Sequence, residues 1–171
     1  MRIVIIGPPG TGKGTVAKKL GKKLKLPIVG GGALLRSEIR KKTKVGLAAK
    51  KYLDNGKLVP SPMIHKLVYK QIKKHKRGLI LDGYPRKLAE TKHLNIEKVI
   101  LIDTSDKNII KRLLARKRAD DTLQVIKNRL KVYRKETMPV INYYKKRGLV
   151  IKINGNLSRK GVFRQVLNAI K

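Results

Sequence analysis

The chain has 171 residues, enough for one ordinary domain with a sizeable core, and it lacks cysteine, which excludes a disulfide framework and a thiolate metal site. No apolar stretch approaches the ~20 residues that span a membrane, so we expect a soluble, cytoplasmic protein without a membrane partner. Forty-four Lys and Arg against ten Asp and Glu give a formal net charge of +34.

This charge favours polyanionic partners. It should steer nucleotides toward the protein and bind nucleic acid or anionic lipid non-specifically at low salt. The alternative is that the lysines only form solvated helix faces, and the sequence favours it. No RNA-binding motif is present, and six Tyr and one Phe offer few stacking platforms.

The first predicted element is an apolar strand, Arg2 to Ile6, followed by a glycine-rich loop and a Lys-rich helix over 15–25. The loop is Gly7-Pro8-Pro9-Gly10-Thr11-Gly12-Lys13-Gly14-Thr15. Its glycines let several backbone N–H groups converge on a polyphosphate, and Lys13 adds a mobile positive charge for the β- and γ-phosphates. Phosphate-binding loops of this kind usually have Ser or Thr directly after the lysine, whereas this chain has Gly14. This difference argues against a hydroxyl group that binds Mg²⁺ directly.

Four more short apolar runs, at 27–29, 79–82, 99–103 and 149–153, alternate with helical patterns. Alternation of this kind predicts an α/β fold, a five-stranded parallel sheet with helices on both faces, in the three-layer P-loop arrangement. No repeat or linker divides the chain, so we expect a single domain.

Two helices, 33–42 and 45–54, form an insertion before a third helix over 62–74, and Asn55-Gly56 should end the second in left-handed conformations. Further on, Ser105 can cap a helix that runs to about Arg116. The next helix is predicted to start at Asp120 or Asp121, Pro139 to kink or restart it, and Ser158 to open the last one.

Several motifs then follow in a fixed order. They are Leu34-Leu35-Arg36, Gly56-Lys57-Leu58-Val59-Pro60, Leu81-Asp82-Gly83-Tyr84-Pro85-Arg86, Arg116, Arg118-Ala119-Asp120-Asp121 and Arg129-Leu130. With the glycine-rich loop, this ordered set resembles the adenylate kinases, which are P-loop nucleoside monophosphate kinases, from Met1 to about Ala169.

The resemblance implies a role for each matching residue. Those implied to be catalytic are Lys13, Arg86, Arg116, Arg118 and Arg129. Those implied to bind ATP are Gly10, Thr11, Gly12, Lys13, Gly14, Thr15, Arg112 and Arg116. Those implied to bind the acceptor monophosphate are Gly31, Arg36, Lys57, Leu58, Val59, Gly83, Arg86 and Glu90.

Phosphoryl transfer agrees with this residue set, because it requires two polyanions to be held in line and charge to be neutralised on the moving group. The planar fork of arginine binds phosphate oxygens in pairs and keeps its charge. Asp82, at the end of an apolar strand, is placed where Mg²⁺ and its waters would lie, although an Asp-Gly turn would also explain it. His65, His75 and His93 are interpreted as surface residues.

One departure from the family is the lid that normally separates the two arginines equivalent to Arg116 and Arg118, because only Lys117 lies between them. We therefore divide the domain into a core (1–29, 60–115 and 119–171), a monophosphate-binding insertion (30–59) and a vestigial lid (116–118). A lid excludes water, so its near absence predicts an open donor site and some hydrolysis, unless a neighbouring subunit covers it.

A second departure lies in the acceptor pocket, where the family's Ser-Thr-Gly-Asp is Gly30-Gly31-Gly32-Ala33 and its adenine-binding glutamine is Glu90. A carboxylate only accepts hydrogen bonds, which suits the two adjacent donors of guanine. The carbonyl of Val59, which the family offers to the amino group of adenine, would repel the carbonyl of guanine. The two features conflict, and AMP remains the preferred acceptor.

The sequence thus predicts an adenylate kinase-like enzyme that uses ATP, Mg²⁺ and AMP, as a monomer or homo-oligomer. The alternatives are a kinase with relaxed or altered preference for GMP, CMP or UMP, an RNA-linked ATPase, and a polyanion binder without turnover. The kinase is favoured because an ATPase needs no second phosphate site equipped with Arg36 and Arg86.

Overall fold

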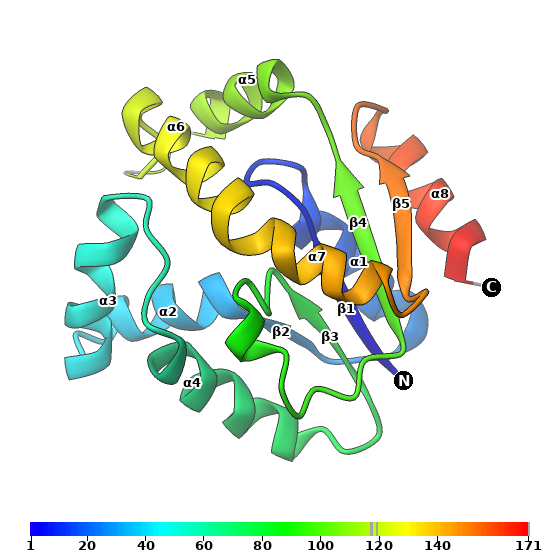
Figure 1. Cartoon of the computed structure of the whole chain (residues 1–171), viewed down its shortest axis with the longest axis horizontal. Helices are drawn as coiled ribbons and strands as arrows, with labels where there is room; N and C mark the ends of the chain where they lie inside the picture. Colours follow the sequence, from blue (N-terminus) through cyan, green and yellow to red (C-terminus); the bar gives the residue numbers. More distant parts are fainter. Residues whose placement is uncertain (117, 119, 171) are drawn as a thin grey trace.

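A computed structural model describes residues 1–116, 118 and 120–170 (Figure 1). Its strands are β1 Arg2–Ile6, β2 Ile28–Gly30, β3 Leu79–Asp82, β4 Lys98–Asp103 and β5 Val150–Asn154. Its α-helices are α1 Lys13–Leu24, α2 Gly31–Arg40, α3 Lys44–Asp54, α4 Ser61–Lys74, α5 Asp106–Arg116, α6 Leu123–Val132, α7 Met138–Lys145 and α8 Arg159–Ile170. A 3-10 turn, η1 Leu88–Glu90, and a π-helical turn, η2 Tyr133–Thr137, complete the set.

The five strands form one parallel sheet in the order β2-β3-β1-β4-β5. Parallel strands need a crossover between them, and the helices supply it on both faces of the sheet. The predicted fold class is therefore confirmed. The carboxyl ends of β1 and β3 are neighbours, with Ile5 in register with Asp82, so the segments that follow these two strands open onto the same edge of the sheet.

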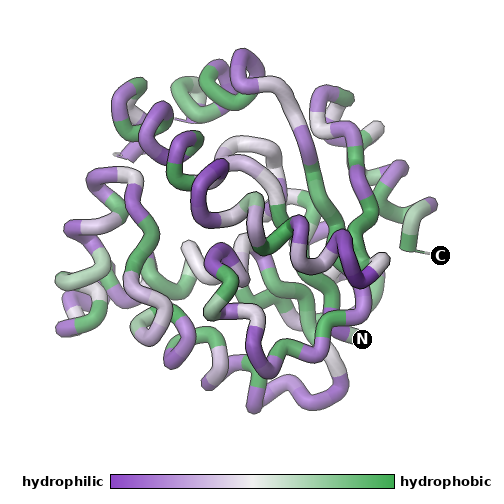
Figure 2. The backbone as a smooth tube through the Cα atoms, viewed as in Figure 1, coloured by the Kyte–Doolittle hydropathy of each residue, from purple (hydrophilic) through white to green (hydrophobic). Residues whose placement is uncertain are grey.

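The sheet separates two apolar cores, because successive side chains of a strand point to opposite faces. From β1, Ile3 and Ile5 pack with α1 and α8, while Val4 and Ile6 pack in the core that holds α4 and α7. In Figure 2 the central strands are mostly hydrophobic, whereas the helices alternate between hydrophobic and hydrophilic residues. A third, smaller cluster joins α5 to α6 through Ile109, Leu113, Ile126 and Leu130.

The strands lie within one residue of their predicted ends, but some helix boundaries differ. Helix α2 begins at Gly31 rather than residue 33, and it ends two residues early because Lys42 takes a left-handed φ of 52°. At the end of α3 only Gly56 is left-handed, with φ 67°, whereas Asn55 has φ −96°. Ser158 does cap α8, since its hydroxyl accepts from the Gly161 N–H at 3.2 Å.

The predicted start of α6 at Asp120 or Asp121 was wrong. Thr122 is the cap, and its hydroxyl accepts from the Val125 N–H at 3.3 Å. The two carboxylates are instead bound to arginines in the pocket described below. The break predicted at Pro139 takes the form of the π-helical turn η2, which precedes that proline.

Helices α2 and α3 pack closely at Gly46, where an added Cβ would lie 2.2 Å from the Glu38 carbonyl oxygen. Backbone cannot move aside as a side chain can, so Gly46→Ala should lower the free energy of unfolding by about 1–3 kcal/mol. Gly161→Ala is the matched control, because the three atoms nearest to its Cβ would be side-chain atoms of Leu157, itself exposed, and Ser158, with the closest at 3.2 Å. That variant should be neutral or gain about 0.5–1 kcal/mol from helix propensity. Urea unfolding measures both, and equal effects would contradict the backbone clash.

Candidate active site

The glycine-rich loop joins β1 to α1, and carbonyl groups of the loop bind the side-chain ammonium of Lys13. The Lys13 Nζ donates to the Gly7 carbonyl at 2.9 Å and to the Pro8 carbonyl at 2.6 Å. Gly10 and Gly12 take left-handed φ values of 81° and 87°, which residues with a Cβ rarely adopt. The loop is thus curled, with the lysine already placed at its mouth before any anion arrives.

The electrostatic environment of Lys13 disfavours its charge. The pKa of Lys13 is lowered from 10.5 to about 7, first by burial and then by the positive charges of Arg86 and Arg116, with the Asp82 carboxylate partly offsetting these effects. A phosphate chain would reverse the balance, because an anion in contact stabilises the ammonium form. An anion bound in the loop would therefore stabilise the charged form of Lys13.

Asp82 approaches this loop from the end of β3. A Cβ on Gly14 would lie 3.2 Å from the Asp82 Oδ2, a distance that few real contacts reach. Glycine at this position leaves room for the carboxylate beside the loop. This gives a physical reason for the departure at Gly14 noted in the sequence.

Arg86 is fixed by the turn that follows β3. Its Nε donates to the Gly83 carbonyl at 2.8 Å, its own N–H donates to the Glu90 Oε2 at 2.8 Å, and its carbonyl accepts from the Thr137 hydroxyl at 3.1 Å. Burial is the largest cause that lowers the pKa of Arg86, and it is opposed by the carboxylates of Asp82 and Glu90. Its guanidinium therefore has a fixed position in the pocket.

Arg36 reaches the same region from α2. Burial, followed by the guanidinium groups of Arg118, Arg116 and Arg86, lowers the pKa of Arg36 to about 10, with Asp82 opposing them. Gly32 lies beside it, and a Cβ there would be 3.2 Å from the Arg36 Nη1. Arginines from separate elements thus converge at short range, an arrangement that is costly unless an anion joins them.

Arg116 and Arg129 are held by two acidic residues. The Asp121 side chain is 1% exposed and accepts from the Arg116 Nε at 2.7 Å, the Arg116 Nη2 at 2.6 Å and the Arg129 Nη1 at 3.1 Å. Arg129 also forms an ion pair with Asp120. Burial, followed by the nearby arginines, lowers the pKa of Arg129 to about 10. These aspartates therefore orient Arg116 and Arg129, and neither forms the helix cap that the sequence predicted.

One pocket of about 870 Å³ brings these groups together. Every residue that the sequence analysis named for the site contributes to its lining, including Arg112, whose Nη1 donates to the Gly155 carbonyl at 2.9 Å. The predicted residues in the lining are Gly10, Thr11, Gly12, Lys13, Gly14, Thr15, Gly31, Arg36, Lys57, Leu58, Val59, Asp82, Gly83, Arg86, Glu90, Arg112, Arg116, Arg118 and Arg129. The individual roles of these residues stay predictions.

Glu90 is only 3% exposed, and its carboxylate is bound within the protein. Its Oε1 accepts from the Ser61 hydroxyl at 3.1 Å, and its Oε2 accepts from the N–H groups of Arg86 and Lys87 at 2.8 and 3.3 Å. Neither Ser61 nor Thr137 was found from the sequence, because each lies 29 or more residues from its partner and a lone hydroxyl residue carries no motif.

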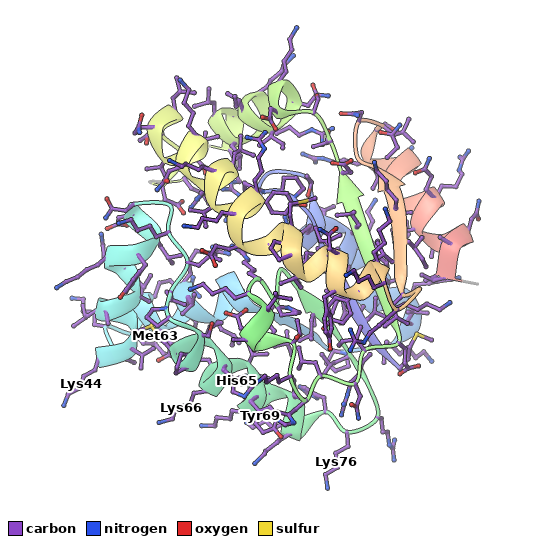
Figure 3. All side chains as sticks on the ribbon, in the orientation of Figure 1. Lys44, Met63, His65, Lys66, Tyr69 and Lys76 are labelled. Carbon is purple, nitrogen blue, oxygen red and sulfur yellow. The ribbon has the colours of Figure 1, made fainter. Side chains whose placement is uncertain are left out.

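His65 is not the simple surface residue that the sequence suggested. Its Nδ1 lies 3.1 Å from the hydroxyl of Tyr84, a buried residue that lines the pocket, and its ring stacks on Tyr69. Figure 3 shows His65 and Tyr69 on neighbouring turns of α4. Within the described residues, no group of three or more His, Cys, Asp or Glu could hold a metal ion, and none of the described helices is both long and apolar enough to cross a membrane.

Comparison with known proteins places this arrangement in a family. Residues 5–149 match the family described as adenylate kinase. Adenylate kinases from Mycolicibacterium paratuberculosis and Mycobacterium tuberculosis are 43% and 41% identical over 181 residues, covering 99% of this chain and 99% of each relative. Adenylate kinase 1 of a Nostoc species is 38% identical over 176 residues, covering 96% of both chains. The chain therefore belongs to the adenylate kinase family.

Proposed function

We propose that the protein catalyses the reversible, Mg²⁺-dependent transfer of the γ-phosphoryl group of ATP to AMP, giving two molecules of ADP. The observation that carries this proposal is that a phosphate-binding loop and a second set of arginines line the same pocket. An enzyme that only hydrolyses ATP needs the phosphate-binding loop but not the second set of arginines. Two anion sites in one cavity fit an enzyme that holds donor and acceptor phosphates together.

In this proposal Lys13 and the loop amides hold the β- and γ-phosphates of ATP, while Arg36 and Arg86 hold the α-phosphate of AMP. An oxygen of that α-phosphate attacks the γ-phosphorus in line, and the bond from the γ-phosphorus to the β–γ bridging oxygen breaks. Arg116, Arg118 and Arg129 neutralise charge on the transferring group. Arg112 lies over the base of ATP.

Mg²⁺ fits the residues that are present. This ion is usually held by one or two carboxylates together with substrate phosphates and waters, and Asp82 supplies such a carboxylate at the loop mouth. We assign Asp82 a water-mediated contact with the ion. When bound, Mg²⁺ would offset charge on the ATP phosphates, which complements the cations of the protein.

We propose that residues 30–59 form the acceptor insertion and that 116–118 are a vestigial lid. Helices α2 and α3 occupy the insertion and contribute Arg36 to the pocket. Lys117 lies outside the described residues. The alignments to the mycobacterial enzymes extend over 181 positions, so at least ten of them have no counterpart in this chain of 171. A shortened lid would leave the donor site open to water and allow slow hydrolysis.

The high charge supports a secondary, non-specific affinity for polyanions, strongest at low salt. Figure 3 shows Lys44, Lys66 and Lys76 projecting away from the body of the protein around α3 and α4. The acceptor arginines argue against an RNA-linked ATPase as the main activity. The oligomeric state and the cytoplasmic location stay predictions.

Substitution of Arg86 tests the assignment of the acceptor site. Arg86→Ala should reduce kcat/KM for AMP by about 10³-fold, because a guanidinium clamp on phosphate is removed. Arg86→Lys should recover part of this loss, since it keeps the charge without the fork. Chromatography of the products formed from Mg²⁺·ATP and AMP gives the rates. Arg77→Ala, at an exposed arginine just before β3, is the control and should leave turnover unchanged.

Near-normal ADP formation by Arg86→Ala would show that the acceptor site is wrongly assigned. Phosphate release that increases with added RNA and ignores AMP would instead support the ATPase.

The lowered pKa of Lys13 predicts that ATP binding takes up a proton. At pH 8 a lysine with a pKa of about 7 is mostly neutral, and the phosphates of ATP raise that pKa, so binding should take up about 0.5–1 proton. At pH 6 the lysine is already charged and the uptake should disappear. Calorimetry of Mg²⁺·ATP binding in buffers of different ionisation enthalpy measures this.

Lys13→Met should abolish the uptake at pH 8, measured at concentrations that still saturate the variant, while Lys22→Met, at an exposed lysine on α1, should retain it. An unchanged uptake in Lys13→Met would assign the proton to another group.

A further inference from the structure

The acceptor side of the pocket offers apolar surface against which a base can pack. Leu35, Leu53, Val59 and Ile64 supply apolar walls, and Arg36 and Arg86 line the same cavity. Near these walls lie two polar groups, the Glu90 carboxylate and the Val59 carbonyl. These groups can select the base, because apolar walls alone discriminate poorly between purines.

The Val59 carbonyl is already bound. The Nζ of Lys87 donates to it at 3.4 Å, from a half-buried side chain 28 residues away in sequence. An ammonium group carries three donors and no acceptor. Lys87 is not itself among the residues that line the pocket, but its Nζ places a positively charged donor beside the carbonyl of Val59, which does line it.

Glu90 supplies the complementary acceptor. Its carboxylate has about four lone-pair positions, and three are used by Ser61 and by the N–H groups of Arg86 and Lys87. One position is left for a ligand.

A donor next to a carboxylate acceptor matches guanine. On the corresponding edge guanine presents the O6 carbonyl, then the N1–H and the 2-amino donors, whereas adenine presents its 6-amino donor and an unprotonated ring nitrogen. The amino group of adenine would compete with Lys87 for the Val59 carbonyl. The flexible stem of Lys87 lets it withdraw when AMP binds.

We infer that the enzyme has a second acceptor activity: it transfers the γ-phosphoryl group of ATP to GMP, with Lys87 donating to O6 and Glu90 accepting from N1–H. An α-phosphate oxygen of GMP forms the new bond to phosphorus, the β–γ bridging bond of ATP breaks, and the products are ADP and GDP. This goes beyond the proposed AMP reaction and uses its phosphate machinery, so it rests on the proposed function.

Lys87→Met is the deciding variant, because methionine retains much of the aliphatic stem and removes the charge. The wild-type and variant enzymes are assayed with Mg²⁺·ATP and, separately, AMP, GMP, IMP and CMP. IMP keeps the O6 carbonyl and N1–H of guanine but lacks the 2-amino group. The control is Lys92→Met, at an exposed lysine five residues further along the chain.

We expect the wild-type enzyme to phosphorylate GMP and IMP faster than CMP. Lys87→Met should lower kcat/KM for GMP and IMP by about 10- to 100-fold, the loss typical of one hydrogen bond to a charged group. The same variant should keep or improve kcat/KM for AMP, because the Val59 carbonyl is freed. Lys92→Met should change none of these values.

Transfer to GMP no faster than to CMP would overturn the inference, as would a GMP-to-AMP ratio that Lys87→Met leaves unchanged. Either result would leave the proposed function intact if AMP is still converted. Loss of AMP conversion by the wild-type enzyme would instead contradict the proposed function itself.

Discussion

The structure depends on one electrostatic constraint, the burial of many cations around a single cavity without enough anions to balance them. Lys13, Arg36, Arg86 and Arg129 all have pKa values lowered by burial, with neighbouring cations lowering those of Lys13, Arg36 and Arg129 further. Packing of the surrounding fold must meet the cost of holding them together. Four of the ten acidic residues, Asp82, Glu90, Asp120 and Asp121, line the cavity or pair with its arginines. The cavity is therefore organised for a ligand that carries several negative charges.

The few acidic residues at the cavity have different roles. Asp121 binds two arginines at once and fixes their spacing, while Glu90 anchors the backbone of the Arg86 turn. Asp82 has neither task and stands beside the phosphate-binding loop. In a chain with a net charge of +34, long-range attraction draws nucleotides inward, but only these short-range contacts determine where each phosphate can lie.

Much of the fold and the pocket lining was predictable, because both depend on local patterns. The spacing of apolar residues predicted that strands and helices alternate along the chain. The glycines spaced around Lys13 predicted the phosphate-binding loop. The contacts that the sequence did not predict are between residues far apart in the chain. The Ser61 contact to Glu90, the Thr137 contact to Arg86 and the Lys87 contact to Val59 leave no local signature. The cap of α6 was missed for a related reason: Asp121 is a good cap in isolation, but buried arginines compete for its carboxylate.

The π-helical turn η2 sets the phase between α6 and α7, which run together in Figure 1. Arg129 and Thr137 both line the pocket although eight residues separate them. In an uninterrupted α-helix, eight residues would rotate the second side chain about 80° past the first. A π-helical turn absorbs one extra residue, which brings that offset down to about 20° and aims both side chains the same way. The extra residue thus acts as an angular spacer, through which one continuous arm can serve the arginine cluster and the Arg86 turn together.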